Sequence, residues 1–315
     1  MKLGCSSESY ERAFADGTLD LFGWLDHCAH ELDVDGVELV DAHLPTADPA
    51  FLREIKRRCT ELQLVVASFA VTSDIAGASD RAAELDRIRR WSDVAAFLGA
   101  PVMRVSAGRA PAPPADAGLV PRLLHRIIGQ PRPNARRVWS DLTFSLRDIA
   151  DHAHERGVMV ALENSREGRI VGTAVALDQC VRDVGSPWLG VALDPADLGT
   201  RVGIEAALER TVLVSARIRQ VRDDGSDPHA HWPGLLQLLR LGHYRGFVHL
   251  RFQGSEPALT AVPRAARYLR GLMLLLARQR LLQGPGPEDG AGALDADAAE
   301  VRLEQFRRAE APPHR

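Results

Sequence analysis

The chain has 315 residues, 45% of them hydrophobic, and a formal net charge of −3. This size suits one large domain, and the nearly balanced charge excludes the strongly basic surface of a nucleic-acid-binding protein. No apolar run approaches the roughly 18 residues that a membrane-spanning helix needs. The opening residues 1–5 predict a strand rather than a signal-peptide core, and the four cysteines are scattered without metal-ligand spacing. We therefore expect a cytoplasmic protein with reduced thiols and without a nucleic-acid or membrane partner.

Short apolar segments alternate with amphipathic ones eight times along the chain. The predicted strands cover residues 2–6, 36–40, 64–69, 101–106, 158–163, 188–194, 213–222 and 246–252. The predicted helices cover residues 18–32, 49–62, 80–98, 138–156, 174–185, 203–210, 231–242 and 256–281. In chain order, Thr18 is the expected N-cap of the first helix, and Gly99 the expected stop of the third.

This strict alternation predicts parallel strands joined by crossover helices. Eight such units favour a closed barrel over an open doubly wound sheet, and no glycine-rich dinucleotide fingerprint follows the first strand. The fold class is therefore predicted as α/β, a (β/α)8 TIM barrel over residues 1–283. Residues 108–137 are rich in Pro and Arg and follow the fourth strand, so we expect an insertion or lid there. Residues 284–315 have the composition of a disordered tail.

The fifth and sixth predicted strands both end on a carboxylate. The apolar run Val158–Leu162 leads directly into Glu163, and Leu189–Leu193 leads directly into Asp194. The carboxyl ends of barrel strands form the active-site face, so these two side chains are expected to be neighbours in the barrel mouth. The alternative is that each one forms a structural ion pair with a nearby arginine.

Other polar side chains are predicted at the same face. Arg104 on the fourth strand would hold a substrate phosphate or carboxylate, or else pair with Glu38 of the second strand. His249 lies two residues before Arg251 on the eighth strand and would act as a general base, or else as a hydrogen-bonded core histidine. His43 follows the second strand and would contact the substrate, or else be an exposed loop residue.

Five motifs, in this order and spacing, carry a resemblance to a known family. They are DGVEL with His43 at the second strand, LGAPVMRVSAG at the fourth, ALEN at the fifth, SPWLGVALDPAD at the sixth, and HWPGLLQLLRLGHYRGFVHLRF at the last helix and strand. Over residues 1–277 the chain resembles the xylose-isomerase-like TIM barrels of the sugar phosphate isomerase/epimerase superfamily.

The resemblance implies a divalent metal in the barrel mouth, and this sequence matches only half of the implied ligands. Glu163 and Asp194 stand where the family has its Glu and Asp ligands. The strand-seven histidine is replaced by Gln220 or Arg222, depending on register, and the strand-eight glutamate by Arg251. Arginine has no acceptor atom, and at about 4 Å it would repel a divalent cation by roughly 8 kcal/mol.

We therefore predict a degenerate metal site with no cofactor, in which Arg251, with or without Arg222, sits against Glu163 and Asp194. The alternative is a weak site for Mg²⁺, Mn²⁺ or Co²⁺ at those two carboxylates.

The resemblance further implies an enzyme, an isomerase, epimerase or related lyase acting on a small sugar, polyol or keto acid. Glu163 would remove a proton next to a carbonyl, while Arg251 stabilises the enolate in place of the metal. The predicted substrate-binding residues are Arg104, Arg222, Gln220, His43 and His249. The alternative is a non-catalytic or repurposed barrel that binds an anionic metabolite or a protein partner. The apolar run Leu272–Leu276 is predicted to be barrel packing or the surface of a homodimer.

Overall fold

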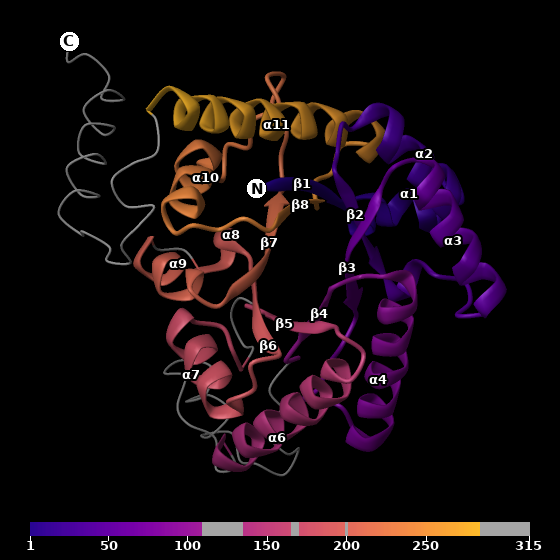
Figure 1. The fold of residues 1–315 in the computed structure, drawn as a ribbon, viewed down its shortest axis with the longest axis vertical. Helices are drawn as coiled ribbons and strands as arrows, with labels where there is room; N and C mark the ends of the chain where they lie inside the picture. The colour runs from indigo at the N-terminus through magenta and orange to yellow at the C-terminus, as the bar shows by residue number, and fades with distance from the viewer. Residues whose placement is uncertain (109–134, 165–169, 199–200, 284–315) are drawn as a thin grey trace, which may run out of the picture. The chain divides into compact units, whose positions relative to one another are not determined.

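The computed structural model describes residues 1–108, 135–164, 170–198 and 201–283. Within them, eight parallel strands close into a barrel in chain order, with β8 pairing back to β1. The helices lie outside this ring of strands (Figure 1). The strands are β1 (Lys2–Ser6), β2 (Gly36–Val40), β3 (Val65–Val71), β4 (Val102–Ser106), β5 (Met159–Glu163), β6 (Leu189–Leu193), β7 (Thr211–Ile218) and β8 (Phe247–Phe252). The predicted (β/α)8 barrel is confirmed.

One main helix follows each strand. These are α2 (Leu21–Glu31), α3 (Pro49–Glu61), α4 (Arg81–Leu98), α6 (Ala135–His154), α7 (Ala174–Val184), α9 (Arg201–Leu208), α10 (Trp232–Leu241) and α11 (Ala258–Gln283). Short helical turns lie between some strands and their main helices: η1 (Ser7–Tyr10) and α1 (Glu11–Ala15) after β1, η2 (Asp41–His43) after β2, and α8 (Pro195–Leu198) after β6. These turns lie at the carboxyl ends of the strands, so they add side chains to the barrel mouth.

Two helix ends test the local predictions. Gly99 ends α4 with a φ of +81°, as expected of a glycine stop. Thr18 is not the cap of α2. The residue before Leu21 is Asp20, which has extended backbone and accepts a 2.7 Å hydrogen bond from the Gly23 amide. The helix therefore begins after Asp20, because that carboxylate satisfies an amide of the first turn.

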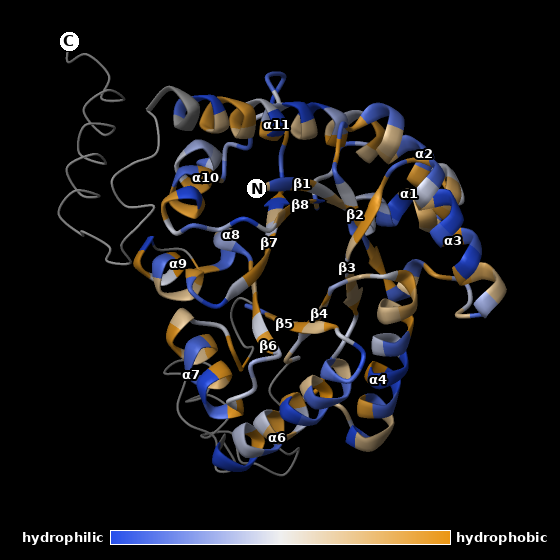
Figure 2. Cartoon of the chain, viewed as in Figure 1, coloured by the Kyte–Doolittle hydropathy of each residue, from blue (hydrophilic) through white to orange (hydrophobic). Residues whose placement is uncertain are grey.

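Alternation along the strands separates an apolar layer from a polar interior. The strands carry mostly hydrophobic residues, and the outer helices show polar residues among the apolar ones (Figure 2). Side chains such as Val37, Met103, Leu162 and Leu250 are completely buried. Between them, every second residue of several strands points into the barrel. The barrel therefore combines a buried apolar core with charged residues gathered at one place.

The chain divides into a unit of Met1–Met273 and a second unit of Leu274–Arg315. Of the second unit the structure describes only the end of α11. The predicted lid falls largely on residues 109–134, and the predicted tail on 284–315; both lie outside the described residues. Residues 135–137, which were assigned to the insertion, belong to α6. All four cysteines are free and buried, as expected. Among the described helices, none has the length and apolar character needed to cross a membrane.

Candidate active site

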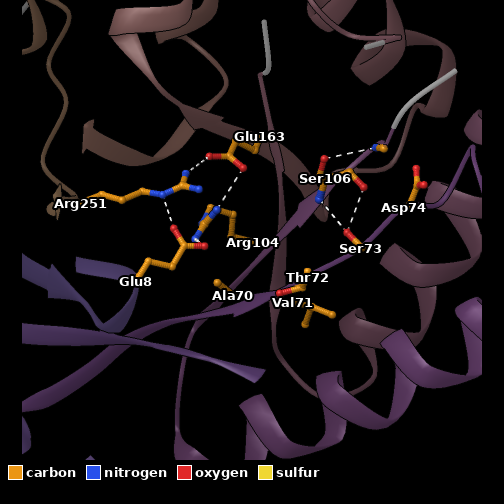
Figure 3. Close-up of a pocket in the computed structure, with 11 residues that line it drawn as sticks. Glu8, Ala70, Val71, Thr72, Ser73, Asp74, Arg104, Ser106, Glu163 and Arg251 are labelled. Atoms are coloured by element: carbon orange, nitrogen blue, oxygen red, sulfur yellow. Dashed lines mark hydrogen bonds and ion pairs between the residues drawn. The ribbon is translucent and has the colours of Figure 1, made fainter. Parts of the chain in front are cut away.

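A cavity of 360 Å³ opens where the strands end. One wall carries the charged side chains of Glu8, Arg104, Glu163 and Arg251, which come from β4, β5, β8 and the turn after β1. The facing wall is formed by the end of β3, the loop that follows it, and the end of β4 (Figure 3). The facing wall consists of backbone groups, small side chains and hydroxyl groups, together with the carboxylate of Asp74.

Arg104 is the centre of the charged wall. Its Nε and Nη2 atoms donate to Glu38 at 3.2 and 2.9 Å, and its Nη1 atom donates to Glu163 at 3.0 Å. Its Nη2 atom also lies 3.2 Å from Glu8. The ion pair with Glu38, one of the two roles foreseen for Arg104, is therefore present, and the same guanidinium also reaches the cavity.

Arg251 holds Glu163 from the other side. Its Nη1 atom pairs with one oxygen of Glu163, and its Nε atom pairs with Glu8. Burial opposes the ionisation of Glu163, but Arg104 and Arg251 outweigh it and keep the pKa of this carboxyl below its usual value. The predicted contact between Arg251 and Glu163 is present. Both oxygens of Glu163 face guanidinium groups.

Asp194 has a different cation beside it. The Asp194 side chain is completely buried, and its Oδ2 atom lies 2.5 Å from Arg217 Nη2, while the same arginine also lies 2.8 Å from Asp197. The Asn164 amide bridges the backbone of Asp194, donating to its carbonyl and accepting from its N–H. Burial raises the pKa of Asp194 to about 6, with Arg217 opposing that rise and Asp197 adding to it. The expected contact of Arg251 with Asp194 is replaced by this second cluster.

The prediction that Gln220 and Arg222 occupy strand seven is wrong. That strand was expected over residues 213–222, whereas β7 covers Thr211–Ile218. Both residues follow the strand and are exposed, and the backbone of Arg222 is part of a turn closed by Ser226. The residue that faces the barrel mouth is Arg217, which is in register with Arg251 of β8. Sequence reasoning missed Arg217 because it extended the apolar pattern beyond the true strand end.

The two predicted histidines lie away from the cavity. His249 is buried within the barrel, with Nδ1 3.1 Å from Ser68 Oγ and 3.5 Å from Glu38. His43 is half-buried, bonded to Ser7 at 2.8 Å and stacked on Phe14. Neither lines the described cavity. The hydrogen-bonded core position foreseen for His249 is the one observed, and substrate binding by either histidine stays a prediction.

The residues at the expected metal positions do not fit a divalent cation. Glu163 faces Arg104 and Arg251, and Asp194 faces Arg217, so guanidinium groups stand where a metal would need open oxygen atoms. A guanidinium offers no lone pair and repels a cation. Within the described part of the chain, no three His, Cys, Asp or Glu side chains are grouped so that they could hold a metal.

The wall that faces the charges is held by a network of its own. Asp41 accepts a 3.0 Å hydrogen bond from the Thr72 amide. Arg87 donates to the Asp41 carboxylate at 2.8 Å and also to the Thr72 carbonyl. Ser73 Oγ donates to the Ser106 carbonyl at 2.9 Å and accepts from its amide at 2.8 Å. These bonds tie the loop after β3 to η2, α4 and β4, so the wall has a defined position.

Gly108 is expected to be essential for this wall. It has a φ of +84°, and a Cβ atom there would lie 2.7 Å from the Cα of Asp74. Gly108→Ala should lower the free energy of unfolding by about 1–3 kcal/mol, since left-handed strain and a backbone clash combine. Gly99→Ala is the matched control, because its φ is +81° and nothing lies within 4 Å of the added atom. Urea unfolding of both variants measures the difference, and equal losses would contradict the clash.

A family model and several solved structures match the fold of this chain. Residues 27–272 match the model of the xylose isomerase-like TIM barrel family. The chain belongs to this family. No protein of curated function matches its sequence. Family membership confirms the resemblance inferred from the strand motifs.

Several solved structures have the same fold as this chain but low sequence identity to it. A protein of Sinorhizobium meliloti 1021 is 14% identical, with a TM-score of 0.67 over 86% of this chain and 98% of the other. D-allulose 3-epimerase from Methylomonas sp. is 15% identical, with a TM-score of 0.65 over 86% and 98%. 3-Keto-D-glucoside 4-epimerase from E. coli is 18% identical, with a TM-score of 0.63 over 86% and 99%. At these identities the likeness concerns the fold alone.

Proposed function

We propose that this protein is an isomerase- or epimerase-like enzyme that removes a proton next to a carbonyl of a small sugar, polyol or keto-acid-like compound, without a divalent metal. The observation that carries the proposal is Glu163 held between Arg104 and Arg251 on the wall of the cavity. A carboxylate supplies the base, and two permanent cations supply the charge that an enolate oxygen needs.

In the proposed reaction, the substrate oxygen replaces the Glu163 carboxylate as the hydrogen-bond partner of the two guanidinium groups. A substrate carbonyl oxygen would accept hydrogen bonds from the guanidinium groups, which now bind Glu163. Glu163 would take the proton from the adjacent carbon, the electron pair of that C–H bond would form a C=C bond, and the π pair of the carbonyl would move to its oxygen. As the negative charge that develops on the oxygen draws the arginines to itself, Glu163 loses part of the interaction that lowers its pKa, and this favours its protonation. Return of a proton to the opposite face of that carbon would complete epimerisation. Its return to the former carbonyl carbon, with the neighbouring hydroxyl proton passing to the carbonyl oxygen, would complete isomerisation.

Proton exchange with solvent tests this proposal directly. Chelator-treated protein is incubated in D₂O with a panel of ketoses, aldoses and keto acids, and loss of the proton next to the carbonyl is followed by NMR. We expect exchange with at least one carbonyl compound, and a decrease of about 10²–10⁴-fold in Glu163→Gln. Glu61→Gln, on the exposed side of α3, is the control and should keep full activity. Exchange that appears only after Mn²⁺ or Co²⁺ is added would refute the metal-free proposal.

A second candidate function is binding without catalysis. The observation in its favour is the lowered pKa of Glu163, because a carboxylate held by two guanidinium groups is a weak base in the free protein. This candidate predicts that a compound of the same panel raises the melting temperature while its C–H proton does not exchange. Exchange that depends on Glu163 would exclude it.

A further inference from the structure

Glu8 is a carboxylate of the site that sequence reasoning missed. It lies in η1, the short turn directly after β1, and precedes the segment that matches the family model. One oxygen lies 3.2 Å from Arg104 Nη2, and the other pairs with Arg251 Nε. The side chain points at both guanidinium groups (Figure 3). Glu8 is thus a third anion on the two arginines that the proposed reaction uses.

Glu8 is also the most accessible carboxylate of this cluster. Its side chain is 21% exposed, compared with 10% for Glu163 and 2% for Glu38. It lines the 360 Å³ cavity and also a neighbouring cavity of 540 Å³ between the η1–α1 segment and the residues after β8. An anion that entered from either cavity would therefore meet the carboxylate of Glu8 at the guanidinium groups.

The cluster formed by Arg104, Arg251 and their three carboxylate partners has a net negative charge. Glu8, Glu38 and Glu163 contribute three negative charges, against two positive charges from Arg104 and Arg251. Despite burial, Arg104 keeps the pKa of Glu38 well below its usual value, so this carboxylate remains charged near neutral pH. A phosphate or carboxylate substrate would bring further negative charge to a cluster that is already anionic, whereas hydroxyl groups can donate to the carboxylates.

We propose that Glu8 acts as an internal carboxylate ligand of Arg104 and Arg251, and that it restricts the site to uncharged, polyhydroxylated carbonyl compounds. Phosphorylated and carboxylate compounds are excluded because Glu8 already occupies the anion position. This inference narrows the substrate class of the proposed function and rests on it for the use of the cavity. The exclusion itself is a binding property and does not depend on turnover.

The test is anion binding by Glu8→Ala, measured by isothermal titration calorimetry at constant ionic strength. Removing the side chain leaves a space for a small carboxylate beside two guanidinium groups, so acetate and inorganic phosphate are the probes. We expect saturable binding by Glu8→Ala, and binding by the unmodified protein that is weaker by on the order of tenfold or more. Adding Arg251→Gln to Glu8→Ala should abolish the gain, because Arg251 supplies part of the vacated site.

Glu11→Ala is the matched control. Glu11 is an exposed residue of α1 that lines the 540 Å³ cavity but not the 360 Å³ cavity, so its removal changes the net charge equally without opening the anion position. The inference is overturned if Glu11→Ala gains binding as Glu8→Ala does, or if the unmodified protein binds either anion as tightly as Glu8→Ala. If Glu8→Ala does not fold, Glu8→Ser replaces it, and a folded Glu8→Ser without phosphate or acetate binding overturns the inference too.

The same measurements separate this inference from the proposed function. Glu8-dependent exclusion of anions together with absent proton exchange would refute the enzyme and keep the role of Glu8. Proton exchange from a phosphorylated compound by the unmodified protein would keep the enzyme and refute the role of Glu8.

Discussion

Arg104→Met is expected to lower the free energy of unfolding by about 3–5 kcal/mol at neutral pH, since it leaves buried carboxylates without their shared cation. Glu38 has a side chain that is only 2% exposed, and Arg104 binds it through two nitrogen atoms. The same substitution removes one of the two cations on Glu163. Urea unfolding at pH 7 measures the loss.

The free energy of unfolding should change with pH in opposite directions in the unmodified protein and in Arg104→Met. In the unmodified protein the pKa values of Glu38 and Glu163 are lowered, so their stabilising contribution is present above the unfolded value of about 4.3 and is lost as the pH falls through the lower folded values. In Arg104→Met, burial without the cation should raise these pKa values. Stability should then increase as the pH falls from 7 towards 5.

Arg81→Met is the control for the Arg104 experiment. Arg81 pairs with Asp141 at 3.0 Å, but both side chains are about one-third exposed or more, so the loss should be within about 1 kcal/mol. Two results would contradict the role of Arg104 as the shared cation. One is a loss of stability in Arg104→Met no larger than that in Arg81→Met, and the other is a pH dependence of Arg104→Met in the same direction as that of the unmodified protein.

Arg251→Glu combined with Arg217→His is expected to create a site for a divalent metal. Arg251→Glu alone should destabilise the protein, because it places a further carboxylate beside Glu163 and Glu8. Arg217 lies on β7 in register with Arg251 and touches Asp194, so a histidine there completes a set with Glu163 and Asp194. Mn²⁺ or Co²⁺ at one hundred times its Kd should then restore about 2.7 kcal/mol of stability.

The control for this design is a second double variant, in which the histidine is placed at a different position. Gln220→His, combined with Arg251→Glu, should gain no metal-dependent stability, because Gln220 is exposed and follows the end of β7. Thermal unfolding with and without chelator compares the two double variants and the unmodified protein. Tight metal binding by the unmodified protein at Glu163 and Asp194 would contradict the metal-free proposal and place the chain with metal-dependent isomerases.

The barrel and one half of the site could be predicted from sequence for a local reason. Buried parallel strands are continuous apolar runs, and eight of them alternating with amphipathic segments leave little choice of fold. A carboxylate directly after such a run lies at the barrel mouth, which is how Glu163 was found. The family resemblance singled out Arg251, which lies one residue before the end of β8, and the structure brings it together with Glu163.

The other half of the site depended on tertiary structure. Register shifts interrupt the pairing of β6 with β7, and β7 ends at Ile218, so the cation on Asp194 is Arg217 and neither Gln220 nor Arg222. Glu8 lies in a short turn that has no strand or helix periodicity, and only barrel closure of β1 against β8 carries it to Arg251. Local pattern determines the type of each element and the face of each residue. The relative shift of neighbouring strands is set by the hydrogen bonds that close the barrel, and no single segment contains that information.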